Sequence, residues 1–214
     1  MKKLLLSISL VFILNVSLKA QDTVRLVHKE YITVFSKSLK YPILTEWWVT
    51  KAKVTCPNPL PRKDRFASDP FLSAETDLTV DYKGSGTDRG HMSPAADNQC
   101  SGPTAMVESF YFSNMAPQYH SLNAGDWKTL EVLTRDLASK EDSIKVWCGS
   151  VGEAKKIGRV SVPTKCWKII YVKKTKEWSA YLFNNDQSKP DGLANNKVTV
   201  QDIERLTNLK FKIK

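Results

Sequence analysis

The chain has 214 residues, of which 42% are hydrophobic and 25% are charged, so it holds enough apolar material for the core of one domain. This composition excludes a disordered chain and a fibrous repeat protein. The formal net charge is +10, which favours an anionic partner such as nucleic acid, an acidic polysaccharide or a membrane surface without choosing among them.

The first 20 residues have the pattern of a secretory signal peptide. Lys2 and Lys3 precede an apolar run over residues 4–16, and Ala20 provides a small residue for cleavage. An uncleaved membrane anchor is the alternative, but the run is shorter than the ~20 apolar residues that a spanning helix needs. We therefore expect a single exported domain, periplasmic or secreted, over residues 21–214. It would retain 29 of the 32 basic residues against 22 acidic residues, a net charge of +7.

The four cysteines would meet an oxidising compartment after export, where an even number favours disulfides. Their spacing contains no C-x-x-C unit, which argues against a zinc site. Three pairings are possible in principle. We expect Cys56 to pair with Cys100 and Cys148 to pair with Cys166.

The first half of the domain is predicted to contain strands, a long loop and a glycine-rich turn. Residues 31–35 and 47–50 are β-branched and aromatic, which predicts two strands around a turn at Pro42. Residues 56–75 hold four prolines and several charges without periodicity, which predicts a loop of a length that is usually functional or crosslinked. Residues 77–98 predict a short strand and a turn, where glycines let the backbone approach a ligand closely.

The second half alternates helix and strand. Apolar residues at helical spacing predict a helix from Ser121 or Asn123 to about Ser139. Thr199 begins a capping-box pattern before a short final helix. The architecture is therefore mixed α and β. The strand-like segments between these helices are residues 144–151, 166–172 and 178–183.

His91 has the surroundings of a general base. It is one of three histidines, and it lies among glycines next to Arg89 and Asp88. Phosphodiester hydrolysis needs a base for the attacking water, a cation for the added charge of the phosphorane, and stabilisation of the leaving oxygen. Imidazole supplies the first near neutral pH, and Mg²⁺ supplies the others while needing few protein oxygens. A turn-stabilising pair and a core histidine are the alternative readings, and His28 and His120 are read as structural.

Two polar side chains of the predicted helix, Asn123 and Glu131, lean toward the body of the protein when the apolar stripe forms the buried face. Burying an amide and a carboxylate is costly without partners, and a hydrated metal ion would satisfy both. They are separated by ~12 Å of helix, so we expect Asn123 to bind the ion directly and Glu131 to act through water. The alternatives are a helix N-cap for Asn123 and an ordinary surface position for Glu131.

Several segments together resemble the DNA/RNA non-specific endonuclease family. Residues 88–91 read Asp-Arg-Gly-His, like the D-R-G-H signature of that family. They are joined, in the family's order, by Arg-Phe-Ala-Ser-Asp-Pro at 65–70, Ser-Asn-Met-Ala-Pro-Gln at 113–118 and Leu-Asn-Ala-Gly-Asp-Trp at 122–127. Residues 162–168 resemble the later P-x-x-x-W-K strand of the family.

This resemblance runs from about residue 45 to the C-terminus. It implies an α+β fold with a mixed, largely antiparallel β-sheet and a ββα-metal active-site motif. It also implies a hydrolase that uses Mg²⁺, with Mn²⁺ able to substitute, and cuts DNA and RNA with little sequence preference, leaving 5′-phosphate ends. The implied roles are water activation by His91, metal binding by Asn123, retention of a metal-bound water by Glu131, phosphate contact by Arg65 and Arg89, ordering of the His91 side by Asn114, and support of the loop or the metal by Asp88.

Two other classes of protein compete with this interpretation. A non-catalytic nucleic-acid or polyanion-binding module would share the charge but would not need His91, Asn123 and Glu131 together. A structural exported domain with a degraded site would lack at least one of them. We therefore expect an enzyme with DNA and RNA as partners and no stable membrane association after signal cleavage. The sequence leaves open the preference for DNA or RNA and the oligomeric state.

Overall fold

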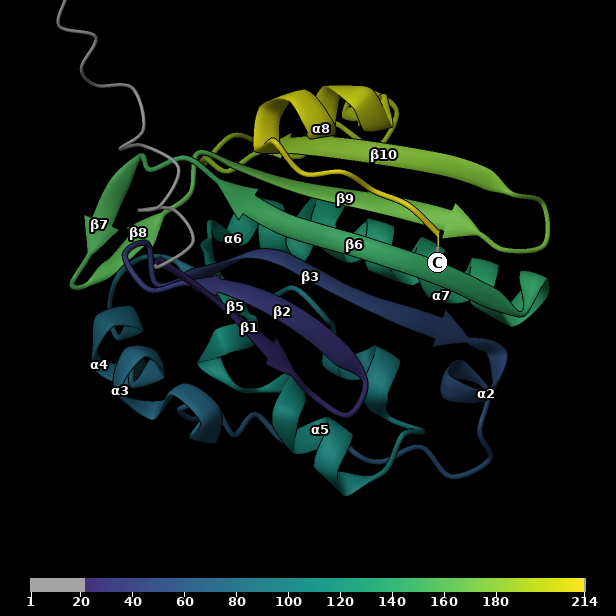
Figure 1. Cartoon of the computed structure of the whole chain (residues 1–214), viewed down its shortest axis with the longest axis horizontal. Helices are drawn as coiled ribbons and strands as arrows, with labels where there is room; N and C mark the ends of the chain where they lie inside the picture. Colours follow the sequence, from purple (N-terminus) through teal and green to yellow (C-terminus); the bar gives the residue numbers. More distant parts are fainter. Residues whose placement is uncertain (1–21, 214) are drawn as a thin grey trace, which may run out of the picture.

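A computed structural model describes residues 22–213, and the predicted signal peptide lies outside the described residues. Its centre is a seven-stranded sheet in the order β1-β2-β3-β6-β9-β10-β11 (Figure 1). The strands are β1 (Thr23–Val27), β2 (Tyr31–Ser36), β3 (Tyr41–Thr50), β4 (Asp88–His91), β5 (Met115–Gln118), β6 (Ser143–Val151), β7 (Lys155–Ile157), β8 (Val160–Val162), β9 (Lys165–Val172), β10 (Glu177–Asn184) and β11 (Lys197–Val198).

The helices are mostly short and lie around this sheet. Those with α geometry are α2 (Lys51–Val54), α3 (Ser73–Thr76), α4 (Thr79–Tyr82), α5 (Pro103–Ser109), α6 (His120–Leu122), α7 (Lys128–Glu141) and α8 (Val200–Thr207). Single turns of other helical geometry are η1 (Pro70–Leu72), η2 (Ala95–Asn98), η3 (Phe112–Asn114) and η4 (Asn123–Trp127). None of the helices in the described part of the chain is long and apolar enough to cross a membrane.

The α+β class and the ββα motif are confirmed. The strand pairs of the large sheet are antiparallel, and β4 and β5 form a separate antiparallel pair. The segment α6, η4 and α7 follows β5 directly, which completes a ββα unit. The predicted capping box at Thr199 is also present, since its side chain and that of Asp202 satisfy each other's backbone N–H groups.

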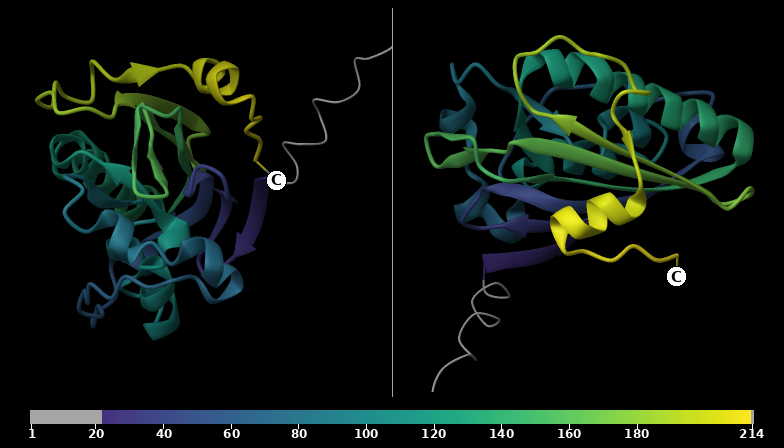
Figure 2. Two further views of the ribbon diagram at one scale, coloured as in Figure 1. Left: turned by 90° about the vertical axis from the view of Figure 1, so that its left-hand side faces the viewer. Right: turned by 90° about the horizontal axis from the view of Figure 1, so that it is seen from above.

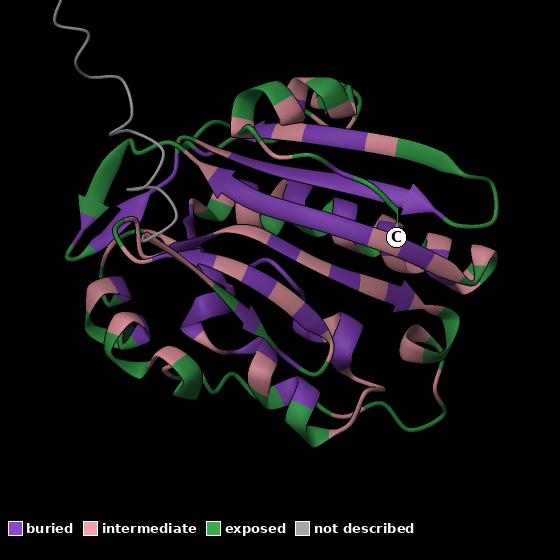
Figure 3. Cartoon of the chain, in the orientation of Figure 1, coloured by how far each residue is buried: buried purple, intermediate pink, exposed green. Residues whose placement is uncertain are grey.

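The central strands are buried on both faces because helices cover both sides of the sheet. Helix α7 and helix α8 lie on opposite faces (Figure 2), and β6 and β9 are buried along most of their length (Figure 3). Alternate residues of β9 therefore enter two cores: Ile170 packs in the core under α7, and Trp167 packs in the core under α8 with Ile203.

One expected detail of the first strands is wrong. The turn between β2 and β3 lies at residues 37–40, and Pro42 is part of β3. Pro42 faces Phe35 at a position where the register of the two strands shifts, and such an irregularity tolerates a residue without an N–H donor. Strand β1 and helix α5 were not predicted, because short segments of this kind are stabilised by tertiary packing.

One of the two expected disulfides forms. Cys56 is bonded to Cys100 with 5.8 Å between their Cα atoms, which ties the long loop to the chain after η2. Cys148 and Cys166 are free and buried, so that pairing is wrong. In the β6–β9 register Cys148 lies opposite Lys168 and Cys166 lies opposite Ser150. The two cysteines are therefore diagonal neighbours, typically ~7–8 Å apart and beyond the Cα separation of most disulfides.

The helical segment after β5 is interrupted at Gly125. This residue has φ −96° and ψ −117°, so α6 and α7 are joined by the wider turn η4 rather than by one regular helix. The loop between β10 and β11 packs on this turn, since a Cβ atom on Gly125 would lie 2.4 Å from Cγ of Pro190. Only glycine at residue 125 permits this approach.

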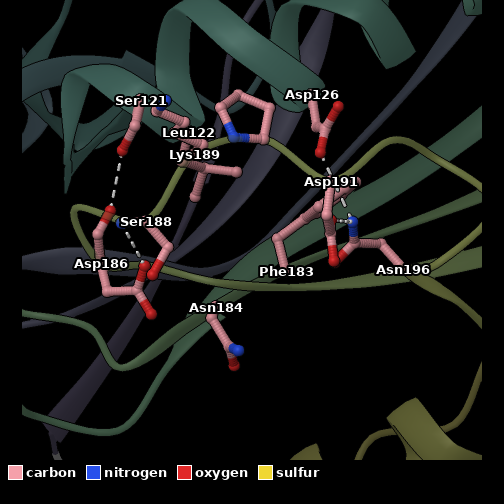
Figure 4. Close-up of a pocket in the computed structure, with 11 residues that line it drawn as sticks. Ser121, Leu122, Asp126, Phe183, Asn184, Asp186, Ser188, Lys189, Asp191 and Asn196 are labelled. Carbon is pink, nitrogen blue, oxygen red and sulfur yellow. Dashed lines mark hydrogen bonds between the residues drawn. The ribbon is translucent and has the colours of Figure 1, made fainter.

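Hydrogen bonds hold the same loop against the turn (Figure 4). The Asp126 carboxylate accepts from the backbone N–H of Gly192 at 3.1 Å, and the Ser121 hydroxyl donates to the carbonyl of Asp186 at 2.9 Å. The loop therefore fixes the geometry of the segment that carries Asn123.

The free cysteines provide a direct check of the fold. We expect two thiols per chain to react with Ellman's reagent in denaturant without reductant, and almost none in the native chain, because both side chains are buried and burial raises the pKa of each thiol. A count of zero thiols in denaturant would contradict the register of β6 and β9.

The contact at Gly125 is also testable. Gly125→Ala should lower the free energy of unfolding by about 1–3 kcal/mol, because the added methyl group overlaps the Pro190 ring. Urea unfolding of Gly125→Ala, Pro190→Ala and the double variant gives the coupling between the two sites. Gly125→Ala should lower the free energy of unfolding less in the Pro190→Ala background than in the wild type. If Gly125→Ala lowers it equally in both backgrounds, overlap with the Pro190 ring is not the cause.

Candidate active site

His91 ends β4 inside an aromatic pocket. Its ring meets the Phe110 ring edge-on at 5.0 Å between centroids and the Phe66 ring at 5.8 Å. Burial, together with the positive charge of Arg62, lowers the pKa of His91 to about 3. The imidazole is therefore neutral at neutral pH. Its Nε2 atom is buried without a hydrogen-bond partner, which leaves a lone pair or a proton available to a substrate.

The glycine of the Asp-Arg-Gly-His signature is required by packing. A Cβ atom on Gly90 would lie 2.0 Å from Oε1 of Gln118, whose side chain is fully buried across the hairpin. Any larger residue would push β4 away from β5 and displace the neighbouring His91. The signature therefore encodes the hairpin as well as the chemistry.

Asn114 lies behind the hairpin and holds the chain that follows His91. Its Oδ1 accepts from the backbone N–H of Ser93 at 2.9 Å, while its Nδ2 donates to the carbonyls of Ser93 and Ser109 at 2.8 and 2.9 Å. The Asn114 carbonyl also accepts from the N–H of Met92 at 2.9 Å. The side chain is fully buried, so its position fits the ordering role that the family resemblance implies.

Arg89 lies on the same face of β4 as His91. Its guanidinium carbon is 4.9 Å from the centroid of the Phe66 ring and 5.8 Å from that of Tyr82, and its Nε is buried without a hydrogen-bond partner. Phe66 thus contacts both Arg89 and His91. A half-buried cation with an unused, buried donor beside a neutral imidazole is an arrangement suited to binding a phosphate oxygen.

Asp88 contacts a second group of polar side chains on the opposite face of β4. Its Oδ2 accepts from Nδ2 of Asn123 at 2.8 Å and is also 2.8 Å from Nδ1 of His120. His120, which we expected to be structural, is exposed, with 80% of its side chain accessible, and borders this group. Because the amide nitrogen of Asn123 is bound to Asp88, its Oδ1 is directed away from that carboxylate.

This group is the part of the chain that fits a metal ion. Among residues 22–213 no three His, Cys, Asp or Glu side chains are grouped as a metal site. The oxygens of Asp88 and Asn123 are hard ligands next to each other, and Mg²⁺ uses one or two such oxygens and keeps several waters. The donor set therefore fits a sparsely bound Mg²⁺, or Mn²⁺ in its place.

Glu131 lies on the sheet side of α7, as the helical spacing predicted, with 15% of its side chain accessible. Its Oε1 lies 3.9 Å from Nζ of Lys168, and that lysine is also 4.0 Å from the centroid of the Trp127 ring. Burial raises the pKa of Glu131 to about 7, against the lowering effect of Lys168. The structure gives no direct contact between Glu131 and Asn123, which agrees with their separation along the helix.

The structure does not bring Arg65 into contact with His91. Arg65 is exposed and lines an apolar groove between the long loop and α5. The arginine of this loop whose charge acts on both His91 and Glu131 is Arg62, which lies 5.5 Å from the Phe110 ring and pairs with Asp64. Sequence reasoning missed Arg62 because the family motif quoted begins at residue 65.

Lys168 is the second residue that sequence reasoning missed. Only 1% of its side chain is accessible, and a lysine in a strand of otherwise apolar character was the available signal. Asp97, which follows the signature in sequence, accepts from Nε1 of Trp47 at 2.9 Å and from Arg135 at 3.1 Å.

Comparisons with known proteins identify the family of the chain. Residues 12–214 match the family described as DNA/RNA non-specific endonuclease. The chain is 34% identical over 168 residues to the mitochondrial nuclease EXOG of Xenopus laevis, covering 69% of this chain and 47% of that protein. It is 35% identical over 166 residues to Nuclease C1 of Cunninghamella echinulata var. echinulata, covering 69% and 66%. It thus spans about half the length of EXOG and two thirds of Nuclease C1.

A solved structure shares the fold. The chain superposes with a TM-score of 0.76 and 26% identity on a crystal structure of the EndoG/EndoGI complex, covering 87% of this chain and 84% of that one. The match over nearly the whole sequence, the relatives above 30% identity and the shared fold show that this chain belongs to the DNA/RNA non-specific endonuclease family.

Proposed function

We propose that the chain is a Mg²⁺-dependent endonuclease that hydrolyses phosphodiester bonds of DNA and RNA with His91 as the general base. One observation carries this proposal: a neutral, buried imidazole with an unpartnered Nε2 lies beside the unpartnered guanidinium of Arg89. The oxygens of Asp88 and Asn123 on the neighbouring face of β4 support a metal-assisted reaction.

In the proposed reaction each of these residues has a separate role. Nε2 of His91 takes a proton from the attacking water, which forms a bond to phosphorus while the bond to the 3′ oxygen breaks, so that the product carries a 5′ phosphate. Arg89 donates hydrogen bonds to a phosphate oxygen as charge accumulates there. A bound Mg²⁺ supplies positive charge to the phosphate and the leaving oxygen. Asn123 and Asp88 would hold that ion.

The remaining residues position this machinery. Glu131 would reach the ion through water, because Lys168 and Trp127 hold it on the sheet side of the helix. Asn114 fixes the backbone after His91, and Arg62 and Arg65 add positive charge for the phosphates next to the cleavage point. Contacts of this kind act on the backbone of nucleic acid and read no bases, which supports low sequence preference.

We further propose that the protein is exported. The support is the signal-peptide pattern of residues 1–20 and the Cys56–Cys100 disulfide, a bond that persists in oxidising compartments. The related EXOG proteins are named as mitochondrial nucleases. Membership of the family therefore does not determine the compartment of this chain.

The first test is cleavage of plasmid DNA and of RNA by the mature chain. Cutting should require a divalent metal, stop on addition of EDTA, and fall by about 10²–10⁴-fold in His91→Ala because the base is lost. His91→Asn should show the same loss while filling more of the pocket. Thermal unfolding of both variants separates lost chemistry from lost structure. Undiminished cutting by a folded His91 variant would remove His91 from the mechanism; no cutting by any chain would favour a binding module.

The second test measures metal binding without catalysis. Asn123→Ala should weaken Mn²⁺ binding by more than about tenfold, because it removes a direct ligand. Glu131→Gln should weaken it less, since that residue would act through water. Binding is read by electron paramagnetic resonance of free Mn²⁺. Asn58→Ala, on the exposed part of the long loop, is the matched control and should bind like the wild type. Equal Mn²⁺ affinity in Asn123→Ala and the wild type would refute the assignment.

A further inference from the structure

The structure contains an apolar groove beside the candidate site that the reaction above does not use. Its volume is about 250 Å³, and it lies between the loop before η1 and helix α5. Apart from two basic residues, Lys63 and Arg65, its lining is apolar. The apolar lining residues are Leu60, Pro61, Pro103, Met106, Val107 and Phe110.

The groove and the His91 pocket share a wall. Phe110 lines the groove and also packs edge-on against the ring of His91 at 5.0 Å between centroids. Arg62 lies against the same aromatic ring at 5.5 Å and places its positive charge near His91. A chain whose phosphate lies at His91 therefore has the groove within reach of the adjoining nucleotide.

The groove is held in place by bonds that do not depend on a ligand. Leu60 and Gln99 are joined twice, by the N–H of Leu60 to the Gln99 carbonyl at 2.9 Å and by Nε2 of Gln99 to the Leu60 carbonyl at 3.2 Å. The adjacent Cys56–Cys100 disulfide crosslinks the same two segments. An apolar surface that is fixed in this way is ready for a flat apolar group.

We infer that this groove receives a nucleobase turned out of a single strand next to the scissile phosphate, while Lys63 and Arg65 contact the adjoining backbone. This inference rests on the proposed nuclease function. The arrangement of positive charge beside an apolar surface matches the two parts of a nucleotide, since the phosphate is anionic and the base has an apolar face. The charged lining disfavours a purely apolar occupant such as a lipid chain.

The groove would bind any of the bases. Its apolar lining residues have no hydrogen-bonding side chain to read a base edge, and Lys63 and Arg65 would contact the backbone, so the base contact is stacking and burial rather than recognition of sequence. It would favour strands that are already unpaired, because turning a base out of a duplex costs the energy of unstacking and unpairing.

The test compares binding of two oligomers by fluorescence anisotropy in EDTA, where no cleavage interferes. One is a labelled 12-residue oligothymidylate, and the other is an abasic deoxyribose-phosphate oligomer of the same length. Val107→Gln changes a half-exposed wall of the groove, at 50% exposure, without changing charge. Leu206→Gln is the matched control, because Leu206 is 41% exposed on α8. Arg65→Gln removes a backbone contact. Thermal unfolding confirms that each variant is folded.

We expect Val107→Gln to weaken binding of oligothymidylate by about threefold to tenfold and to leave binding of the abasic oligomer unchanged, as lost stacking of one base predicts. Arg65→Gln should weaken binding of both oligomers by similar factors, and Leu206→Gln should change neither. The inference is overturned if Val107→Gln binds oligothymidylate like the wild type, or loses affinity for both oligomers equally. Because this assay contains no metal and no cleavage, its outcome is independent of whether His91 acts as the base.

Discussion

The indole of Trp127 joins the three parts of the molecule that make the candidate site. Its Nε1 donates to the carbonyl of His91 at 3.1 Å, which attaches the helical segment to the end of β4. Its face lies 4.0 Å from Nζ of Lys168 in β9, and its ring meets Phe183 of β10 edge-on. Hairpin, helix and central sheet therefore meet on one fully buried side chain. A shift of this indole would move His91 relative to the residues of the helix.

Buried charge is the second constraint on the site. A lysine whose side chain is almost entirely inaccessible is tolerated only with compensation, and Lys168 finds it in the π face of Trp127 and in the carboxylate of Glu131. Asp97 and Arg135 form another largely buried pair nearby. Such pairs contribute little net stability compared with apolar packing. Their value is geometric, because each charge fixes the position of its neighbour.

Most of the site could be predicted from residues that are close in sequence, and the rest depends on contacts between distant segments. Residues 88–91 carry the proposed base, the neighbouring arginine and the tight hairpin together. Helical spacing also predicted that Glu131 faces the body of the protein, and in the structure it lies near Lys168 of the sheet. Arg62 had no local signal, and Lys168 had only that of a lysine in a largely apolar strand. Their positions in the site depend on a loop and a strand that reach it through the fold. The disulfide pairing of Cys148 with Cys166 was wrongly predicted for the same reason. Whether two cysteines can pair depends on the register of their strands, and the number of cysteines does not reveal that register.

The cations near the candidate site differ in how far they are exposed to solvent. Lys63 and Arg65 are exposed on the loop and lie on the groove, and Arg62 is exposed on the same loop. Arg89 is instead half-buried and is held against Phe66 with an unused donor. Exposed charges attract a polyanion to the surface, but salt at moderate ionic strength screens this attraction at distances beyond about 10 Å. Partly buried charges are screened much less. In the proposed reaction the solvated cations would attract the nucleic-acid backbone, and Arg89, held in place, would meet the developing negative charge without rearrangement.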